Sequence, residues 1–132
     1  MKDPHWSSKT NGDFVSVYDI VQANLLAMEK SGADGMALNV ASGEPISVRE
    51  VASALASALG VGIKPELTGK YRAGDIRHCF ADISAIKKHL GYEPQVKFAE
   101  GVRELVGWLR EQRAEDRAAE AVRKLTVYGL TA

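Results

Sequence analysis

The sequence predicts an α/β fold in which short strands alternate with amphipathic helices. Short runs rich in apolar residues occur at 14–18, 36–40 and 63–67, and they have the length of strands. Longer segments repeat apolar residues at the i, i+3, i+4 and i+7 spacing of one helix face. Glycine or proline lies near most boundaries between these segments. The predicted order is strand, helix, strand, helix, strand, loop, strand, helix, helix.

The N-terminal part predicts a strand, a helix and a second strand. Residues 1–12 are polar and carry Pro4 and Gly12, so they predict a leader or loop. Residues 14–18 alternate with period two and predict a short strand. A helical stripe then runs from Asp19 and ends at Gly32. Residues 36–40 predict a buried strand.

The clearest helix start in the chain is at Ser47. Ser47 and Glu50 have the spacing of a capping box, and Ile46 precedes them as part of a hydrophobic staple. An amphipathic helix follows and ends at Gly60. Residues 63–67 predict a strand, which Pro65 places at a sheet edge because proline cannot donate to the ladder.

The C-terminal half predicts three more helices. Asp82 can cap the first, which ends at Gly91. The second carries an apolar stripe over 102–109, and Trp108 on it is interpreted as a core residue. The third repeats the spacing over 118–125, and the polar residues 111–117 are either a solvated continuation or a break. Residues 13–110 are therefore assigned to one lobe, and residues 111–132 to a C-terminal helical extension.

Composition limits the classes of partner. The 132 residues include 17 basic and 17 acidic side chains, so no net field favours nucleic acid or an anionic membrane. The chain has a single cysteine, Cys79, which excludes an intrachain disulfide and a cysteine-rich metal site, and fits a reducing cytoplasm. No apolar run approaches the roughly 20 residues of a membrane span. A soluble cytoplasmic domain is expected.

The segment 71–82 holds the main candidate site. Arg72 precedes Asp75 by three residues, with Gly74 between them to bend the backbone. The guanidinium group offers donors that suit a phosphate, and an ionised carboxylate accepts from sugar hydroxyls. A nucleotide phosphate and its ribose would satisfy this pair. The alternative is a surface ion pair between Arg72 and Asp75, and the spacing alone does not separate the two.

Motifs for catalysis are missing from the chain. It contains no glycine-rich dinucleotide loop, no Tyr-x-x-x-Lys pair, no Gly-x-Ser-x-Gly elbow, no His-Glu-x-x-His and no P-loop. His78 and Cys79 are adjacent, but neighbouring residues of a strand point to opposite faces, which argues against a nucleophile and base. No catalytic residue and no metal ligand is assigned.

Four motifs carry a resemblance to a known family. They are Asp13-Phe14-Val15-Ser16-Val17-Tyr18-Asp19, Leu38-Asn39-Val40-Ala41-Ser42-Gly43 running to Ser47-Val48-Arg49-Glu50-Val51, Arg72-Ala73-Gly74-Asp75, and Ala81-Asp82-Ile83-Ser84 through Leu90-Gly91-Tyr92-Glu93-Pro94. In this order, over residues 13–109, the chain resembles the C-terminal part of the NAD-dependent sugar-nucleotide epimerases and dehydratases. These are the extended short-chain dehydrogenase/reductases, which include the UDP-glucose 4-epimerases.

The resemblance implies specific roles for the candidate residues. Arg72 would bind the diphosphate of a UDP-, GDP- or dTDP-sugar, and Asp75 its ribose. Residues 13–110 would form a small sugar-nucleotide-binding lobe. In the family this lobe packs on a Rossmann domain that carries the NAD loop and the Tyr-x-x-x-Lys pair. The chain resembles the last two-fifths of such an enzyme, without the catalytic half.

Three positions depart from the family pattern. Gly12 stands where members commonly have a second phosphate-binding arginine, which weakens the expected phosphate affinity. Cys79 stands where UDP-galactose epimerases have a sugar-contacting tyrosine, which puts a galactose or glucose substrate in doubt. Cys79 is nevertheless the third candidate substrate-binding residue. The usual Asn-Val-Gly-x-Gly turn continues here as Ala41-Ser42-Gly43, a difference interpreted as structural.

Two functions follow as expectations. The first is a nucleotide-sugar-binding lobe of an NAD-dependent isomerase or dehydratase, inactive alone, without its own cofactor and completed by a separate Rossmann-domain chain. The second is a non-enzymatic remnant that associates with itself or with a partner. Without the Rossmann domain, apolar surface should be uncovered, so a homo-oligomer is expected.

Overall fold

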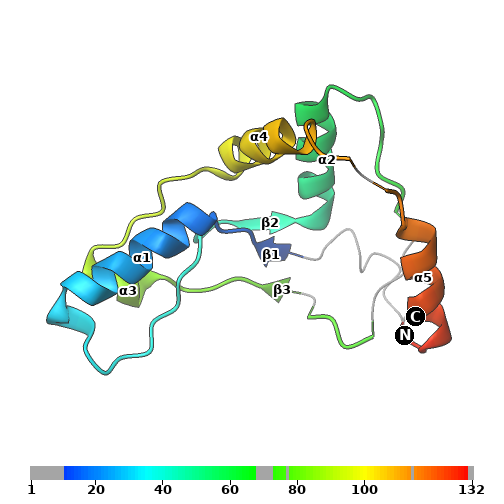
Figure 1. Ribbon diagram of the computed structural model, residues 1–132. Helices are drawn as coiled ribbons and strands as arrows, with labels where there is room; N and C mark the ends of the chain where they lie inside the picture. Colours follow the sequence, from blue (N-terminus) through cyan, green and yellow to red (C-terminus); the bar gives the residue numbers. More distant parts are fainter. Residues whose placement is uncertain (1–10, 68–72, 77, 114, 131–132) are drawn as a thin grey trace.

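The computed structural model describes residues 11–67, 73–76, 78–113 and 115–130. The described chain forms five α-helices, one 3₁₀ turn and a three-stranded mixed sheet. Their bounds are β1 Asn11–Asp13, α1 Val17–Glu29, η2 Ser31–Ala33, β2 Pro45–Ser47, α2 Val48–Leu59, β3 His78–Cys79, α3 Ser84–Leu90, α4 Phe98–Leu109 and α5 Ala118–Val127. The sheet lies centrally, with α2 and α4 above it, α1 and α3 at one end and α5 at the other (Figure 1). This arrangement confirms the α/β class with short strands and separate helices.

The sheet has the order β2-β1-β3. The central strand β1 pairs antiparallel with β2 and parallel with β3. Gly12 lies opposite Ile46 on one side and opposite Cys79 on the other. β1 thus includes Asn11 and Gly12, which the sequence analysis assigned to the leader.

The prediction of a strand at 14–18 is wrong. α1 begins at Val17 instead, and Ser16 is its N-cap residue, with its hydroxyl accepting the backbone N–H of Tyr18 at 3.3 Å. Asp19 adds an acidic side chain to the first turn, where the helix dipole favours negative charge. This local helix-start chemistry outweighs the strand propensity of the aromatic and β-branched residues.

The strands predicted at 36–40 and 63–67 are also absent from the described structure. A strand requires a neighbour to receive its backbone hydrogen bonds, and the sheet described here consists of β1, β2 and β3 alone. In the first segment, Leu38 and Val40 still pack against the core at alternate positions. In the second, Ile63 and Leu67 are exposed.

The predicted capping box of α2 is confirmed. The Ser47 hydroxyl accepts from the backbone N–H of Glu50 at 3.2 Å, and the Glu50 carboxylate accepts from the backbone N–H of Ser47 at 2.8 Å. The helix ends before Gly60, as predicted. These bonds from Ser47 hold the pKa of Glu50 below its ordinary value.

We expect Ser47→Ala to lower the free energy of unfolding by about 1 kcal/mol, the usual cost of losing a helix N-cap. Since the pKa of Glu50 is lowered in the folded state, its contribution is present above about pH 4.5 and is lost as the pH falls through the folded value. The difference between wild type and variant should therefore shrink in acid. Urea unfolding at pH 7 and pH 3 measures it. Ser53→Ala, on an exposed position of the same helix, is the control; an equal loss there would contradict the capping account.

The buried core lies between α1, α3, the segment that follows η2 and the residues on either side of α3. Its members are Ala23, Ala41, Ile83, Ile86, Leu90 and Tyr92. The predicted helix after Asp82 is confirmed as α3, and the Asp82 carboxylate accepts the backbone N–H of Ser84 at 2.8 Å. At the other end of α3, the Lys30 ammonium donates to the carbonyl oxygen of Leu90 at 2.6 Å, which joins α1 to α3.

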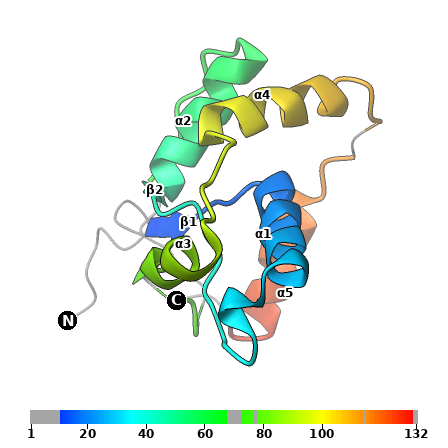
Figure 2. The ribbon, with the colours of Figure 1, turned by 90° about the vertical axis from the view of Figure 1, so that its left-hand side faces the viewer.

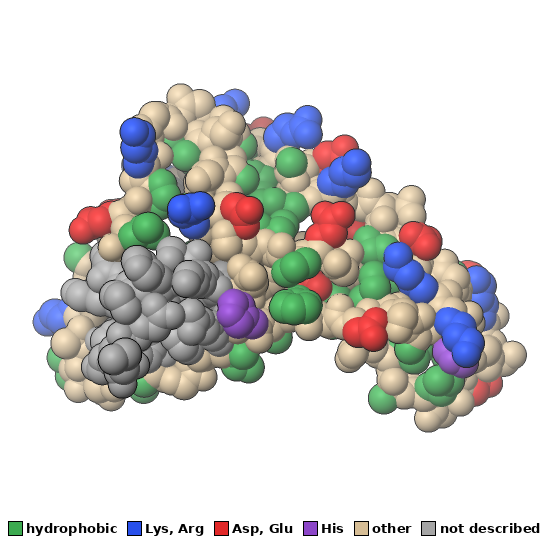
Figure 3. All heavy atoms as spheres, turned by 180° about the vertical axis from the view of Figure 1, so that it is seen from behind, with side chains coloured by type: hydrophobic (Ala, Val, Ile, Leu, Met, Phe, Trp, Pro, Cys, Tyr) green, Lys and Arg blue, Asp and Glu red, His purple; other side chains and the backbone are tan. Residues whose placement is uncertain are grey.

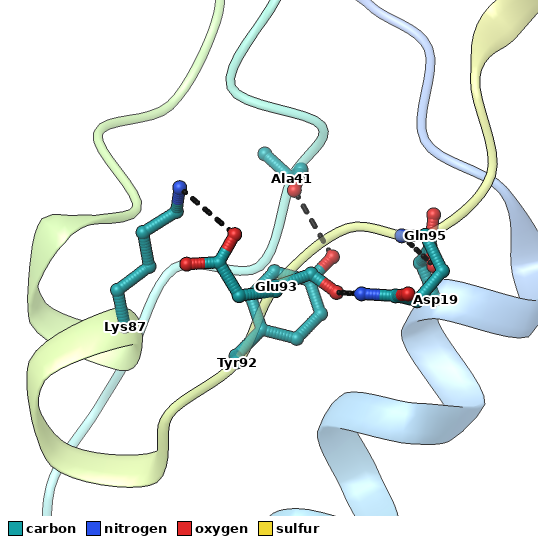
Figure 4. A network of polar contacts seen from close by, with 6 residues as sticks. All are labelled: Asp19, Ala41, Lys87, Tyr92, Glu93 and Gln95. Atoms are coloured by element: carbon teal, nitrogen blue, oxygen red, sulfur yellow. Dashed lines mark hydrogen bonds and ion pairs between the residues drawn. The ribbon is translucent and has the colours of Figure 1, made fainter.

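A chain of polar contacts fastens the segment between α3 and α4 (Figure 4). The Tyr92 hydroxyl donates to the carbonyl oxygen of Ala41 at 3.1 Å. The buried Asp19 carboxylate accepts the backbone N–H groups of Gln95 at 2.8 Å and Val96 at 3.3 Å. Three parts of the chain that are distant in sequence are thereby held together: the start of α1, the turn after residue 40 and the entry to α4.

The last two helices differ in how they pack. α4 contacts α2 and buries Val102 and Val106. The interpretation of Trp108 as a core residue is wrong, because its side chain is 57% exposed. The helix ends after α4, and a second helix, α5, begins at Ala118. α5 includes the apolar stripe predicted over 118–125, but it has no buried residue. None of the described helices is long and apolar enough to cross a bilayer.

Candidate functional site

The predicted phosphate and ribose motif lies in the loop before β3. Of its residues the structure describes Ala73, Gly74 and Asp75, whereas Arg72 lies outside the described residues. Gly74 has a φ of 88°, in the left-handed region that other residues rarely adopt. The predicted need for a glycine at this bend is therefore confirmed. No hydrogen bond or ion pair joins the exposed Asp75 carboxylate to another described residue.

The C-terminal extension contacts this loop. The backbone N–H of Ala73 donates to the carbonyl oxygen of Leu130, just after α5, at 2.8 Å. In Figure 1, α5 accordingly lies at the end of the sheet to which the loop runs. A segment beyond the predicted lobe thus helps to position the loop that carries Asp75. Sequence reasoning missed this contact because no local pattern links two residues so distant in the chain.

Two of the positions that depart from the family pattern are neighbours. Cys79 lies opposite Gly12 in the parallel pairing of β3 with β1. Residues in register on adjacent strands direct their side chains to the same face. The Cys79 thiol is exposed and unpaired. A single patch of the sheet therefore carries the Cys79 thiol and, at Gly12, a position without a side chain. Cys79 is also close in sequence to Asp75.

The turn at 41–44 is held against the end of β1. One oxygen of the Asp13 carboxylate accepts from both the backbone N–H of Ser42, at 2.8 Å, and its hydroxyl, at 2.6 Å. The backbone N–H of Glu44 in turn donates to the Ser42 hydroxyl at 3.1 Å. Gly43 has a φ of 74°, and a Cβ there would approach the Ile83 side chain to 2.9 Å. Ser42 occupies the variable position of the Asn-Val-Gly-x-Gly turn, whereas the position that departs from the family pattern is Ala41, which is buried in the core.

An apolar hollow of about 470 Å³ lies on another part of the molecule, between the start of α1 and one face of α4. We name it the α1–α4 groove and define it by Phe14, Val17, Tyr18, Phe98, Leu105 and Trp108. The Phe14 and Phe98 rings line it and lie 5.7 Å apart in a tilted arrangement. At its edge the Tyr18 hydroxyl donates to the Glu104 carboxylate at 2.8 Å, which raises the pKa of Tyr18. Sequence reasoning missed this groove, although the spacing of Phe98, Leu105 and Trp108 on one helix face was visible.

No described residues form a group of three or more His, Cys, Asp or Glu side chains that could hold a metal ion. Among the described residues, this site therefore offers backbone bends, the exposed Asp75 carboxylate and the Cys79 thiol. This set suits recognition of a polar ligand, with hydrogen bonds accepted by Asp75. Within the part of this loop and sheet that the structure describes, no acid and base are hydrogen-bonded to each other for proton transfer.

Comparison with known proteins identifies the family. The family model described as GDP-mannose 4,6 dehydratase matches residues 7–105. UDP-glucose 4-epimerase from Mycolicibacterium smegmatis is 36% identical over 100 residues, which are 76% of this chain and 31% of the relative. dTDP-L-rhamnose 4-epimerase from Burkholderia thailandensis is 29% identical over 100 residues, 76% of this chain and 27% of the relative.

Solved structures agree with this match. The crystal structure of UDP-glucose 4-epimerase from Thermotoga maritima with UDP-glucose superposes with a TM-score of 0.66 at 28% identity, covering 83% of this chain and 42% of that one. UDP-N-acetylglucosamine 4-epimerase from Methanobrevibacter ruminantium, in complex with UDP-N-acetylmuramic acid, gives a TM-score of 0.65 at 30% identity, covering 76% of this chain and 32% of that one. The chain spans about a quarter to a third of the length of the curated relatives it matches. The chain belongs to the NAD-dependent sugar-nucleotide epimerase/dehydratase family, and it corresponds to a part of the full-length members.

Proposed function

We propose that this chain is the nucleotide-sugar-binding part of an NAD-dependent epimerase or dehydratase. The Arg72 guanidinium binds the diphosphate, and the Asp75 carboxylate accepts from the ribose hydroxyls. The observation that carries this proposal is the Arg-x-Gly-Asp motif, which lies inside the matched region and has Gly74 in a left-handed bend. It is also supported by the relative that was crystallised with UDP-glucose.

The sugar end of the ligand is assigned to the patch formed by Cys79 and Gly12. These two positions are in register on β3 and β1 and share one face of the sheet. At these two positions, family members commonly have a tyrosine and an arginine. The Cys79 thiol and the bare backbone of Gly12 offer fewer hydrogen bonds than those side chains, and they leave more room for the sugar. We therefore propose that Cys79 contacts the sugar and that this sugar differs from galactose and glucose. The single cysteine fits a reducing, cytoplasmic setting.

On its own, the 132-residue chain is expected to show no epimerase, dehydratase or reductase turnover. Hydride chemistry needs a bound nicotinamide and a positioned base. The sequence contains neither the glycine-rich dinucleotide loop nor the Tyr-x-x-x-Lys pair. Fluorescence titration of the purified chain with NADH checks cofactor binding, and NMR analysis of UDP-, GDP- and dTDP-sugars incubated with the chain and NAD checks turnover. Saturable NADH binding or any new sugar product would contradict this expectation.

Isothermal titration calorimetry with UDP-, GDP- and dTDP-sugars tests the binding proposal. Arg72→Ala should weaken binding by about 10- to 150-fold, because a hydrogen bond to a charged group contributes about 1.5–3 kcal/mol. Its thermal unfolding should match that of wild type. Arg49→Ala, an exposed position on α2, is the matched control and should bind like wild type.

The outcomes of this titration are distinct. If Arg72→Ala unfolds, Arg72 is a structural ion-pair residue and its proposed role is wrong. If wild type binds none of the nucleotide sugars, the non-enzymatic alternative is favoured, in which the chain serves as an association module.

A further inference from the structure

The end of α5 forms a complete C-terminal cap. The backbone N–H of Gly129 donates to the carbonyl oxygen of Thr126 at 3.0 Å, and that of Leu130 donates to the carbonyl oxygen of Leu125 at 2.9 Å. Gly129 has a φ of 65°, in the left-handed region. These two bonds and this conformation are the Schellman motif, which satisfies carbonyl groups at a helix end. The helix itself therefore places the backbone of Leu130.

The carbonyl oxygen of Leu130 accepts a hydrogen bond from the loop of the candidate site. The donor is the backbone N–H of Ala73, at 2.8 Å. Among the described residues, no other hydrogen bond joins 73–76 to another part of the chain. Gly74 follows with its left-handed φ of 88°, and Asp75 is the next residue. The cap of α5 thus holds the backbone at the entrance to the bend that carries Asp75.

The connection from α4 does not by itself fix the position of α5. Residues 110–117 lead from one helix to the other, and the described ones form no helix or strand (Figures 1 and 2). A stretch of this length can span up to about 26–29 Å when extended. The bond between Leu130 and Ala73 is therefore a defined link between this helix and the loop.

The position of this loop matters for a ligand that few groups hold. A carboxylate accepts from a hydroxyl only within about 2.5–3.0 Å, so Asp75 has to be held to a fraction of an ångström. The chain has 17 basic and 17 acidic side chains, and both kinds are interspersed over the face seen from behind (Figure 3). No net field therefore draws in an anionic ligand. A loop that is already fixed in its binding conformation loses less entropy when the ligand binds, which raises the affinity.

We propose that the cap of α5 is a positioning element for nucleotide-sugar binding. The Leu130 carbonyl holds Ala73, and through it Asp75, where the carboxylate accepts from the ribose hydroxyls. Binding of the ligand and ordering of the cap are therefore coupled, and the coupling is reciprocal. This inference rests on the proposed function, and it adds to the site a segment that lies outside the matched residues 7–105.

Calorimetry with UDP-glucuronic acid, GDP-mannose and dTDP-L-rhamnose gives the first test. Gly129→Val puts a β-branched residue in the left-handed region and should break the cap. It should weaken binding by about 2- to 12-fold, the change that one hydrogen bond accounts for. Gly129→Asn should bind like wild type, because asparagine adopts this conformation more readily.

Gly60→Val is the matched control. Gly60 ends α2 through the same pair of bonds, with a φ of 72°. A Cβ at Gly60 or at Gly129 meets no described atom within 4 Å, so both substitutions act through the backbone alone. Gly60→Val should lose stability as Gly129→Val does, but it should bind the nucleotide sugars like wild type.

Amide hydrogen exchange measured by NMR gives the second test. In the free chain, Gly129→Val should speed exchange at the Ala73 amide, and Gly129→Asn should leave it unchanged. In wild type, a saturating concentration of whichever of the three nucleotide sugars binds most tightly should slow exchange at the Leu130 amide. The wild-type comparison needs no variant, so it decides the question if Gly129→Val unfolds.

The outcomes separate this inference from the proposed function. A wild type that binds none of the three nucleotide sugars would overturn both. A wild type that binds, together with equal affinity in Gly129→Val and unchanged exchange at Ala73, would overturn the positioning role alone. An equal loss of binding in Gly60→Val would also overturn it, because the effect would then come from general destabilisation. Ligand binding that leaves exchange at Leu130 unchanged would contradict the coupling.

Discussion

Tyr92→Ala is expected to lower the free energy of unfolding by about 3–5 kcal/mol, the range for removing a buried aromatic side chain. Tyr92 is 0% exposed and lies at the centre of the core with Ile86 and Leu90. Native domains are stable by only about 5–15 kcal/mol. This one substitution should therefore remove much of the stability of the fold. Urea unfolding followed by circular dichroism measures the effect.

Tyr92→Phe separates packing from hydrogen bonding. It keeps the ring but leaves the carbonyl oxygen of Ala41 without its bond, so a loss of about 1 kcal/mol is expected. Burial raises the pKa of Tyr92 above the ordinary value near 10. Its contribution to stability is therefore full below about pH 10 and is lost as the pH rises through the folded value. Wild type should lose stability in alkali more steeply than Tyr92→Phe. A loss below 1 kcal/mol for Tyr92→Ala would show that the core is organised around other residues.

Asp19→Ala is expected to cost about 2–4 kcal/mol, because it leaves two backbone N–H groups without their charged acceptor. These are the N–H groups of Gln95 and Val96, at the entry to α4. Asp19 is 2% exposed, so water cannot readily replace the carboxylate. Hydrogen exchange measured by NMR should show much faster exchange at these two amides.

Asp19→Asn is the matched variant. Its side chain has nearly the same shape but only one oxygen acceptor, so it should keep one of the two bonds and lose about half as much stability. Protection of Gln95 and Val96 that is unchanged in Asp19→Ala would contradict the assigned role. An equal loss in Asp19→Ala and Asp19→Asn would mean that the charge, rather than the two bonds, matters.

The helices were predictable from the sequence because their signals are local. Ser47 and Glu50 are three residues apart and fix the start of α2 by themselves. The glycines at the ends of α2 and α3 act in the same local way. The strands were not predictable, since a strand forms only where a distant segment pairs with it. The run 14–18 had the composition of a strand, yet Ser16 begins a helix there.

The same distinction between local signals and long-range pairing applies to the candidate site. The Arg-x-Gly-Asp motif is local, and its Gly74 bend could be anticipated from residue chemistry. The meeting of Gly12 and Cys79 depends on the pairing of β1 with β3, which no sequence pattern indicates. Trp108 was assigned to the core because helical periodicity identifies an apolar face without showing what covers it. The α1–α4 groove was missed for the same reason.

The most direct measurement of the central claim is an NMR titration of the isotope-labelled chain with UDP-glucuronic acid, GDP-mannose and dTDP-L-rhamnose, none of which carries glucose or galactose. The account predicts that at least one of them shifts the amide signals of Gly74, Asp75 and Cys79 and leaves Gly101 in the α1–α4 groove unmoved. Arg72→Ala should abolish these shifts at the same ligand concentration. Shifts confined to Gly101 and its neighbours, or no shift with any of the three ligands, would contradict nucleotide-sugar binding at this motif.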